Sequence, residues 1–259
     1  MAKDFLSRIV EQKKEEVEDA RKRFPEKQLK EESGRPRTRR PFLKQLERPG
    51  VNIIAEIKRA SPSKGVICAD LNPVTYASAY QQGGAAALSV LTDHPYFQGS
   101  PEDLKAAREA VNLPVLRKDF IISSYQIYES CVLGADAVLL IVRILSMEQL
   151  IDYLDICSEL QLDALVETHS EEEIEKANLA GARLVGINNR NLSSFETNIE
   201  NAVNMASLLD SDQVAVAESG IRGREDIEKL KSAGIHNFLI GESLVRASDP
   251  KAFLNSLIG

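Results

Sequence analysis

Residues 53–65 read IIAEIKRASPSKG, an apolar run that carries two opposite charges near its end. The run begins as a buried strand would, but Glu56 and Lys58 interrupt it. Charged side chains are costly to bury unless they are paired or take part in chemistry. The two residues therefore indicate either a structural ion pair or a functional site at the end of a strand.

The rest of the chain follows a repeating pattern, in which short β-rich runs alternate with longer helix-like segments. The sequence predicts strands at 52–58, 85–90, 114–118, 136–142, 163–167, 184–189, 214–218 and 237–240. Several of the helices between them end at a glycine, namely Gly83, Gly134, Gly181 and Gly234. Several begin at a capping residue, namely Ser100, Ser146, Ser170 and Asp249.

Eight βα units predict a parallel sheet. Closed into a barrel, eight such units occupy about 250 residues, which suits a chain of 259. The alternative is an open doubly wound sheet, which loses support because no GxGxxG follows the first strand. We therefore predict an α/β fold, a single (β/α)8 TIM barrel at 49–259 that carries the catalytic site.

The barrel follows an N-terminal helical extension and basic linker at 1–48. Residues 1–32 are charged and helix-like, and glycine and prolines then break the pattern. The run RPRTRRP at 35–41 holds four arginines. We interpret it as a solvated linker, and the alternative is a basic arm that binds a partner.

Composition excludes several classes of protein. The net charge of -7 argues against a general attraction to nucleic acid. The longest aliphatic run, at 135–142, is far shorter than a membrane span, and the first residues do not resemble a signal peptide. Three widely spaced cysteines suit a reducing compartment, so we expect a cytoplasmic protein. The three histidines have no metal-binding spacing, so no metal site is expected.

Polar residues gather where the predicted strands end. They are Glu56, Lys58, Lys118, Glu167, Asn188 and Glu218. The carboxyl ends of the strands form the face of a βα barrel that carries chemistry. Alternation turns these side chains inward, with Ile54, Leu165, Gly186 and Val216 below them. Taken singly, each has a structural explanation, such as a rim ion pair, a lysine extending to water, a loop cap or an Asn-Asn turn. Taken as a set in one register, they favour a catalytic site.

Two glycine-containing segments follow the last two strands. They read AESGI at 217–221 and LIGESL at 239–244. Loops at these positions, with a short extra helix, commonly bind phosphate in such barrels, because backbone N–H groups point at the anion. The alternative is an ordinary turn glycine at each place.

Eight segments together resemble indole-3-glycerol phosphate synthase. They read AEIKRASPSKG, SVLTDHPYFQGS, LRKDFI, GADAVLLIVRIL, LVETH, GINNRNL, AESGI and IGESLVR, in that family's order from about residue 50 to residue 246. The resemblance implies a cofactor-free carboxy-lyase of tryptophan biosynthesis. Its substrate would be a phosphorylated, anthranilate-derived small molecule, 1-(2-carboxyphenylamino)-1-deoxyribulose 5-phosphate. Ring closure, decarboxylation and dehydration would give indole-3-glycerol phosphate. We expect a monomer that binds neither nucleic acid nor membrane.

The resemblance also implies a role for each matching residue. Lys118 would protonate the ketone oxygen during ring closure, and Glu167 would act as the base of the dehydration half. Lys58 would bind the substrate carboxylate, and a share of the acid role stays open for it. The other three catalytic assignments are Glu56, which positions the lysines, Asn188, which orients substrate, and Glu218, a polar support.

The implied binding residues fall into three groups. Phosphate contacts are Ser61, Ser219, Gly220, Gly241 and Glu242; Arg190 lies near the carboxylate; the aromatic ring meets Phe97, Phe120, Leu192 and Ile240. Some relatives carry serine where this chain has Glu242. A carboxylate repels phosphate, so we expect this position to use its backbone N–H alone.

Two other functions fit the sequence less well. Phosphoribosylanthranilate isomerase shares the barrel class and uses a Cys/Asp pair, but no cysteine ends the first predicted strand. A barrel that binds RNA or a partner through the arginine run is the other alternative, and such an arm alone should bind nucleic acid weakly at moderate salt.

Overall fold

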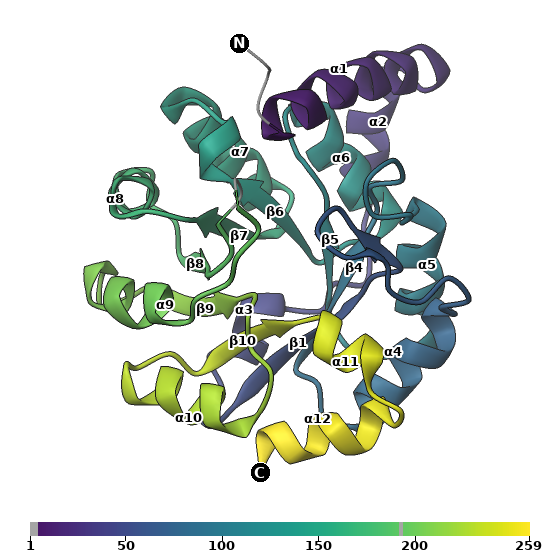
Figure 1. Cartoon of the computed structure of the whole chain (residues 1–259). Helices are drawn as coiled ribbons and strands as arrows, with labels where there is room; N and C mark the ends of the chain where they lie inside the picture. The colour runs from purple at the N-terminus through teal and green to yellow at the C-terminus, as the bar shows by residue number, and fades with distance from the viewer. Residues whose placement is uncertain (1–4, 192–193) are drawn as a thin grey trace.

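The computed structural model describes residues 5–191 and 194–259, and within them eight parallel strands close into a barrel (Figure 1). The strands are β1 (Asn52–Ile57), β4 (Ala87–Leu91), β5 (Val115–Lys118), β6 (Ala137–Ile141), β7 (Asp163–Thr168), β8 (Leu184–Asn188), β9 (Val214–Glu218) and β10 (Asn237–Ile240). Each pairs with the next in this order, and β10 pairs with β1. The predicted closed barrel is confirmed, and the open sheet is wrong.

Helices form the outer ring of the barrel. They are α4 (Pro73–Gln82), α5 (Pro101–Ala110), α6 (Ser124–Leu133), α7 (Met147–Glu159), α8 (Glu171–Leu179), α9 (Glu200–Met205), α10 (Arg224–Ser232) and α12 (Pro250–Ile258). Two short 3-10 turns, η1 (Val142–Ile144) and η2 (Ala206–Leu208), and the short helix α11 (Glu242–Arg246) complete this part of the chain. All four predicted capping side chains accept a backbone N–H. After α4, the residue with left-handed backbone is Gly84 rather than Gly83, the predicted end of this helix.

The strands alternate as predicted between the barrel interior and the helices. Ile54, Leu165 and Val216 belong to one buried cluster inside the barrel. Their neighbours Ile53 and Ala55 belong to the cluster that packs against the helices. Because this register holds along each strand, the polar residues at the strand ends point into the mouth of the barrel.

The other end of the barrel is closed by the short helix α3 (Phe42–Leu46). Phe42 and Leu46 are both buried and pack with the interior cluster. The helix thus seals the amino-terminal end of the strands with apolar side chains and leaves the carboxyl-terminal end open. The boundary between residues 48 and 49 stays a prediction.

The first two helices, α1 (Phe5–Arg23) and α2 (Glu26–Ser33), confirm the helical extension, with a break at Pro25. Figure 1 shows α1 lying beside α6 at the rim of the barrel. Lys13 of α1 is buried, with its Nζ atom 2.9 Å from Asp93 and 3.0 Å from Asp119. These two carboxylates follow β4 and β5, so an internal ion pair fixes α1 over the carboxyl-terminal ends of the strands.

The arginine run does not behave as a free linker. Arg37 donates to the carbonyl oxygen of Ala135 at 2.8 Å. Arg40 donates to the carbonyl oxygens of Arg108 and Leu113 at 3.1 and 2.9 Å. The prediction of a solvated linker is therefore wrong at these two arginines, which fasten the extension to the closed end of the barrel.

Within the described residues, no helix is both long and apolar enough to cross a membrane. In the same part of the chain, no group of three or more His, Cys, Asp or Glu side chains is arranged to hold a metal ion. The three cysteines carry free thiols.

Candidate active site

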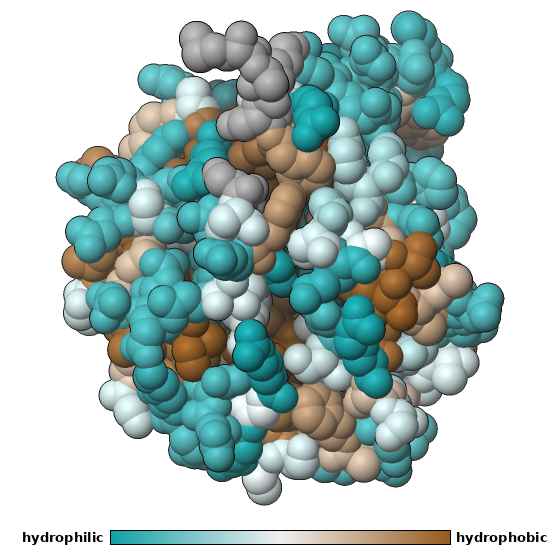
Figure 2. Space-filling view, in the orientation of Figure 1, coloured by the Kyte–Doolittle hydropathy of each residue, from teal (hydrophilic) through white to brown (hydrophobic). Residues whose placement is uncertain are grey.

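A pocket of about 800 Å³ opens at the carboxyl-terminal ends of the strands. In Figure 2 the centre of this face is hollowed, with apolar colour in its depth and a polar rim. Every residue that the sequence assigned to the site lines this pocket, except Leu192, which lies outside the described residues. The structure thus brings the assigned residues together from all around the barrel.

Lys118 lies at the centre of the charged part of the pocket. Its Nζ atom is 2.7 Å from Glu167 Oε2 and 3.3 Å from Glu218 Oε2. Burial favours a lower pKa for this lysine, but the charges of Glu167, Glu218 and Glu56 outweigh burial and raise its pKa. The side chain is only 14% exposed, so it does not extend to water as the structural alternative required.

The two carboxylates beside Lys118 have different protonation preferences. Burial acts to raise the pKa of Glu167, but Lys118 and His169 outweigh it and lower that pKa to about 2. Burial raises the pKa of Glu218 to about 8, against the attraction of Lys118 and with help from the charge of Glu167. Two carboxyl groups whose pKa values diverge are the mark of an acid–base site.

A glycine makes room for the protonated carboxyl group. A Cβ atom on Gly186 would collide with Oε1 of Glu218. That oxygen is buried and has no hydrogen-bond partner among the described residues. The absence of a side chain at Gly186 is therefore what allows Glu218 to lie beside Lys118.

Glu56 and Lys58 form an ion pair with each other at the end of β1. Glu56 is buried, while Lys58 keeps 16% of its side chain exposed toward the pocket. A Cβ atom on Gly241 would collide with the Glu56 carboxylate, so β1 and the loop after β10 meet closely here. The pair lines the pocket, which leaves Lys58 accessible to an anion.

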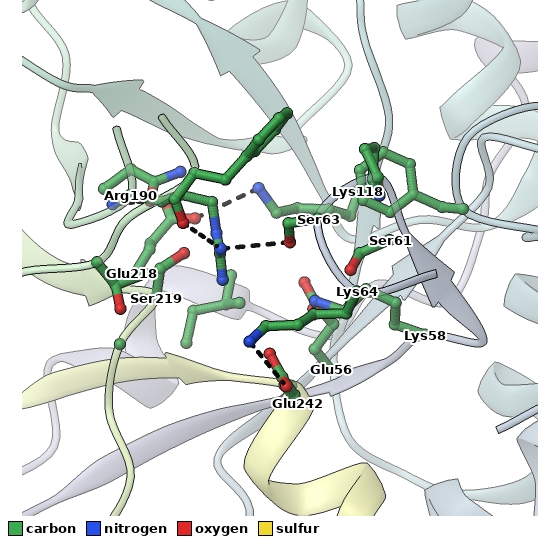
Figure 3. Close-up of a pocket in the computed structure, with 18 of the residues that line it drawn as sticks. Glu56, Lys58, Ser61, Ser63, Lys64, Lys118, Arg190, Glu218, Ser219 and Glu242 are labelled. Carbon is green, nitrogen blue, oxygen red and sulfur yellow. Dashed lines mark hydrogen bonds and ion pairs between the residues drawn. The ribbon is translucent and has the colours of Figure 1, made fainter. Parts of the chain in front are cut away.

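A small hairpin that the sequence did not predict carries part of the rim. It consists of β2 (Ala60–Ser61) and β3 (Gly65–Val66), which pair antiparallel after β1. Between them, the hydroxyl of Ser63 lies 3.3 Å from Arg190 Nη1 (Figure 3). The same guanidinium donates to the carbonyl oxygen of Phe195 at 2.9 Å. Arg190 is thus held across the mouth of the pocket by two loops.

The expected phosphate end carries more positive charge than the sequence indicated. Ser219 and Gly220 both have left-handed backbone, with φ of 66° and 79°, which turns the loop after β9. The Glu242 carboxylate accepts from Arg246 Nε at 3.1 Å and lies 3.9 Å from Lys64 Nζ (Figure 3). Lys64 and Arg246 were not assigned from the sequence, yet both line the pocket.

The extension also contributes to the pocket, which the sequence left open. Phe5, Leu6 and Ile9 of α1 line its apolar side. The Phe5 ring makes edge contacts with Tyr96 and Phe195, at centroid distances of 5.5 and 5.6 Å. The amphipathic pattern of α1 predicts a buried face but does not say which part of the barrel that face meets.

Of the two neighbouring asparagines, only Asn188 lines the pocket. Its Oδ1 atom accepts from the backbone N–H of Arg190 at 3.0 Å. Asn189 turns away: it donates to the carbonyl oxygen of Ser219 at 3.2 Å and accepts from the N–H of Ala202 at 3.0 Å. Asn188 therefore forms the local turn expected of this dipeptide and also lines the pocket, whereas Asn189 connects the end of β8 to the loop after β9 and to α9.

Known proteins resemble this chain along nearly its whole length. Residues 6–257 match the family model described as indole-3-glycerol phosphate synthase. The protein of that name from Desulfosudis oleivorans is 56% identical, with 98% of each chain covered. The one from Syntrophobacter fumaroxidans is 53% identical, with 99% of this chain and 98% of that one covered.

A solved structure agrees on the architecture. Thiamine phosphate pyrophosphorylase from Pyrococcus furiosus superposes with a TM-score of 0.58 over 80% of this chain and 93% of that one. At 16% identity this likeness concerns the fold alone. The family match and the close relatives decide the matter: the chain belongs to the indole-3-glycerol phosphate synthase family.

Proposed function

We propose that this protein converts 1-(2-carboxyphenylamino)-1-deoxyribulose 5-phosphate to indole-3-glycerol phosphate, with the loss of carbon dioxide and water. The observation that carries the proposal is the position of Lys118 between Glu167 and Glu218, whose pKa values move apart. This arrangement places one protonated amine, one ionised carboxylate and one protonated carboxyl group in the same pocket. Proton donors and a proton acceptor are what the reaction requires.

In the ring-closure half, Lys118 acts as the acid. The ring carbon attacks the substrate ketone, a C–C bond forms, and the ketone oxygen takes the Lys118 proton to become a hydroxyl. Carbon dioxide then leaves from the same ring carbon. Carboxylate charge around the lysine, that of Glu167 above all, raises its pKa and holds it protonated until substrate arrives.

In the dehydration half, Glu167 takes a proton from the carbon next to the ring nitrogen, a C=C bond forms, and the C–O bond breaks. The hydroxyl leaves as water with a proton from Lys58, for which a share of the acid role stays open. The free carboxylate is held by Lys118 and is a weak base in that state. When Lys118 turns to the substrate oxygen, Glu167 loses that partner and becomes more basic. Glu218 stays beside the pair as a polar support that holds its own proton.

Binding follows from charges at opposite sides of the pocket. Lys58 and Arg190 face the substrate carboxylate, and the backbone around Gly220 and Gly241 receives the phosphate. Glu56 holds Lys58 in place through their ion pair. Asn188, Ser61, Ser219 and the backbone of Glu242 add polar contacts, while the aromatic ring lies against Phe97, Phe120, Leu192 and Ile240.

The location, the oligomeric state and the partners of the protein are also proposals. We propose a cytoplasmic monomer that acts on this small molecule without nucleic acid. The free thiols and the use of Arg37 and Arg40 as internal donors support this. Size-exclusion chromatography with light scattering tests the monomer, and a second peak at twice the mass would contradict it.

The decisive experiment is the appearance of indole-type fluorescence when substrate is added. Lys118→Ala should lower turnover by about 10²–10⁴-fold, the usual contribution of general acid catalysis. Lys105→Ala, an exposed lysine on α5, is the matched control and should retain full activity. Near-normal turnover in Lys118→Ala would refute the acid role, and no fluorescence with the unmodified protein would refute the function.

A further inference from the structure

A buried histidine lies behind the proposed base. His169 follows β7, and its side chain is only 5% exposed. Its Nε2 atom is 3.5 Å from Glu167 Oε1, and its Nδ1 atom is 3.3 Å from Glu173 Oε2 on α8. One imidazole therefore bridges the catalytic carboxylate and a second carboxylate on the neighbouring helix.

The far side of this bridge is firmly held. Glu173 Oε2 accepts a hydrogen bond from the backbone N–H of His169 at 2.8 Å. The same oxygen lies 3.3 Å from Nδ1 of the His169 ring. The other oxygen, Oε1, accepts from Arg143 Nε at 2.8 Å. A carboxylate accepts hydrogen bonds only, so Nδ1 carries its hydrogen and the ring is fixed in direction.

The near side of the bridge faces the reaction. Nε2 is buried and has no hydrogen-bond partner within residues 5–191 and 194–259. The oxygen ahead of it, Glu167 Oε1, is the one that Lys118 does not use, because Lys118 binds Oε2. The two oxygens of Glu167 are thus divided between a lysine that meets substrate and a histidine that does not.

This division matters when Lys118 gives its proton away. Glu167 then loses Lys118 as its Oε2 partner and keeps Glu218, which holds its own proton, on the pocket side, so both its orientation and its pKa are less firmly held. A second donor at Oε1 keeps the carboxylate aimed during this interval. With a hydrogen on both ring nitrogens, His169 would stand second after Lys118 among the charges that lower the pKa of Glu167.

We propose that His169 is a positioning residue for Glu167, whose Nε2–H holds the Oε1 atom of the base while Glu173 fixes the ring. The proposal rests on the role given to Glu167 above. It predicts that His169 affects the chemical step and its pH dependence rather than substrate affinity. A histidine that only fills space would change neither.

The kinetic test uses two variants of His169. His169→Phe keeps most of the volume and removes both ring nitrogens, and His169→Gln restores an N–H donor without charge. We expect kcat to fall about tenfold in the Phe variant, a fraction of the roughly 10²–10⁴-fold due to a general base, with KM unchanged. The acid limb of the kcat–pH profile should move to higher pH, because the pKa of Glu167 rises when its positive neighbour is removed.

The Gln variant should recover part of kcat but not the position of the acid limb. His236→Gln is the matched control, because His236 is exposed at the opposite end of the barrel. Unchanged kcat and acid limb in the Phe variant would overturn the proposal. Equal losses in Phe and Gln with an unmoved acid limb would overturn it too, since they indicate packing.

A readout independent of turnover separates this inference from the proposed function. The ring 15N signals of His169 should show a hydrogen on Nε2 in the unmodified protein. That hydrogen should be lost in Glu167→Gln, because the variant replaces the carboxylate with an amide. Glu173→Gln should disturb Nδ1 instead. A bare Nε2 in the unmodified protein overturns the proposal, even if the enzyme makes indole-3-glycerol phosphate.

Discussion

Replacing Lys13 with methionine should detach α1 from the barrel. Methionine keeps the length of the side chain but removes the charge that lies between Asp93 and Asp119. Removing one partner of a buried ion pair costs about 3–5 kcal/mol. The cost in stability should lie at the lower end of this range, for two reasons. Asp119 keeps its ion pair with Arg117 at 3.2 Å. Burial already raises the pKa of Asp93, so Asp93 can take a proton when the lysine is removed.

This loss of free energy is comparable with the contribution of the apolar contacts that hold α1 on the barrel. The apolar side chains of α1 that are fully covered are Ile9 and Val17. Each contributes about 1.5–3 kcal/mol on burial, or about 3–6 kcal/mol together, before the cost of ordering the helix. A loss of about 3 kcal/mol removes most of that, whereas the barrel keeps its own core. We therefore expect local release of α1 rather than unfolding.

The assay is hydrogen exchange over residues 5–23 together with steady-state kinetics. Amide protection in α1 should fall while the strands stay protected. KM should rise, because Phe5 and Leu6 leave the pocket wall, and kcat should change little. Lys14→Met is the control, since Lys14 is 60% exposed and pairs with Glu11 on its own helix. Full protection of α1 and an unchanged KM in Lys13→Met would refute the reasoning.

Three further predictions concern the carboxylates of the pocket. The folded-state pKa of Glu218, about 8, exceeds its ordinary 4.5, so its contribution to stability is present below pH 4.5 and is lost as pH rises through 8. Glu218→Gln should therefore flatten the decline of the urea midpoint between about pH 5 and pH 9, and parallel declines would contradict this. Glu167→Gln should slow dehydration, so that a decarboxylated intermediate accumulates in rapid-quench samples; slowed ring closure without an intermediate would contradict it. Glu242→Ala should bind product equally or more tightly, because Arg246 and Lys64 are freed; a large loss of affinity by calorimetry would show that the carboxylate itself makes a contact.

The register of the strands could be predicted because a period of two is a property of the chain itself. Glu56, Glu167 and Glu218 end strands whose alternate residues are apolar, so one inward direction followed for all three. The barrel then brings the strand ends together, since parallel neighbours present the same end to the same face. Nothing beyond the sequence was needed to place these side chains in one pocket.

Other parts of the site depend on contacts that no local pattern encodes. The strands β2 and β3 have two residues each, too few for a period to show. Arg37 and Arg40 bind backbone carbonyl oxygens far along the chain, and a carbonyl group has no sequence signature. His169 lies one residue beyond the end of β7, and its importance depends on the position of α8. These features follow from tertiary packing and could not be read from the chain.

The pairing of β1 with β10 has a consequence for how the protein is made. A chain leaving the ribosome produces β1 early and β10 almost last, at about 5–20 residues per second. Until β10 arrives, β1 has an open edge, and Glu56 is not yet packed against Gly241. The cost of burying the charged cluster is therefore deferred to the last step of folding, when nearly the whole core already exists. Catalytic competence should appear abruptly, as a property of finished molecules, and partial products of translation should carry none of it.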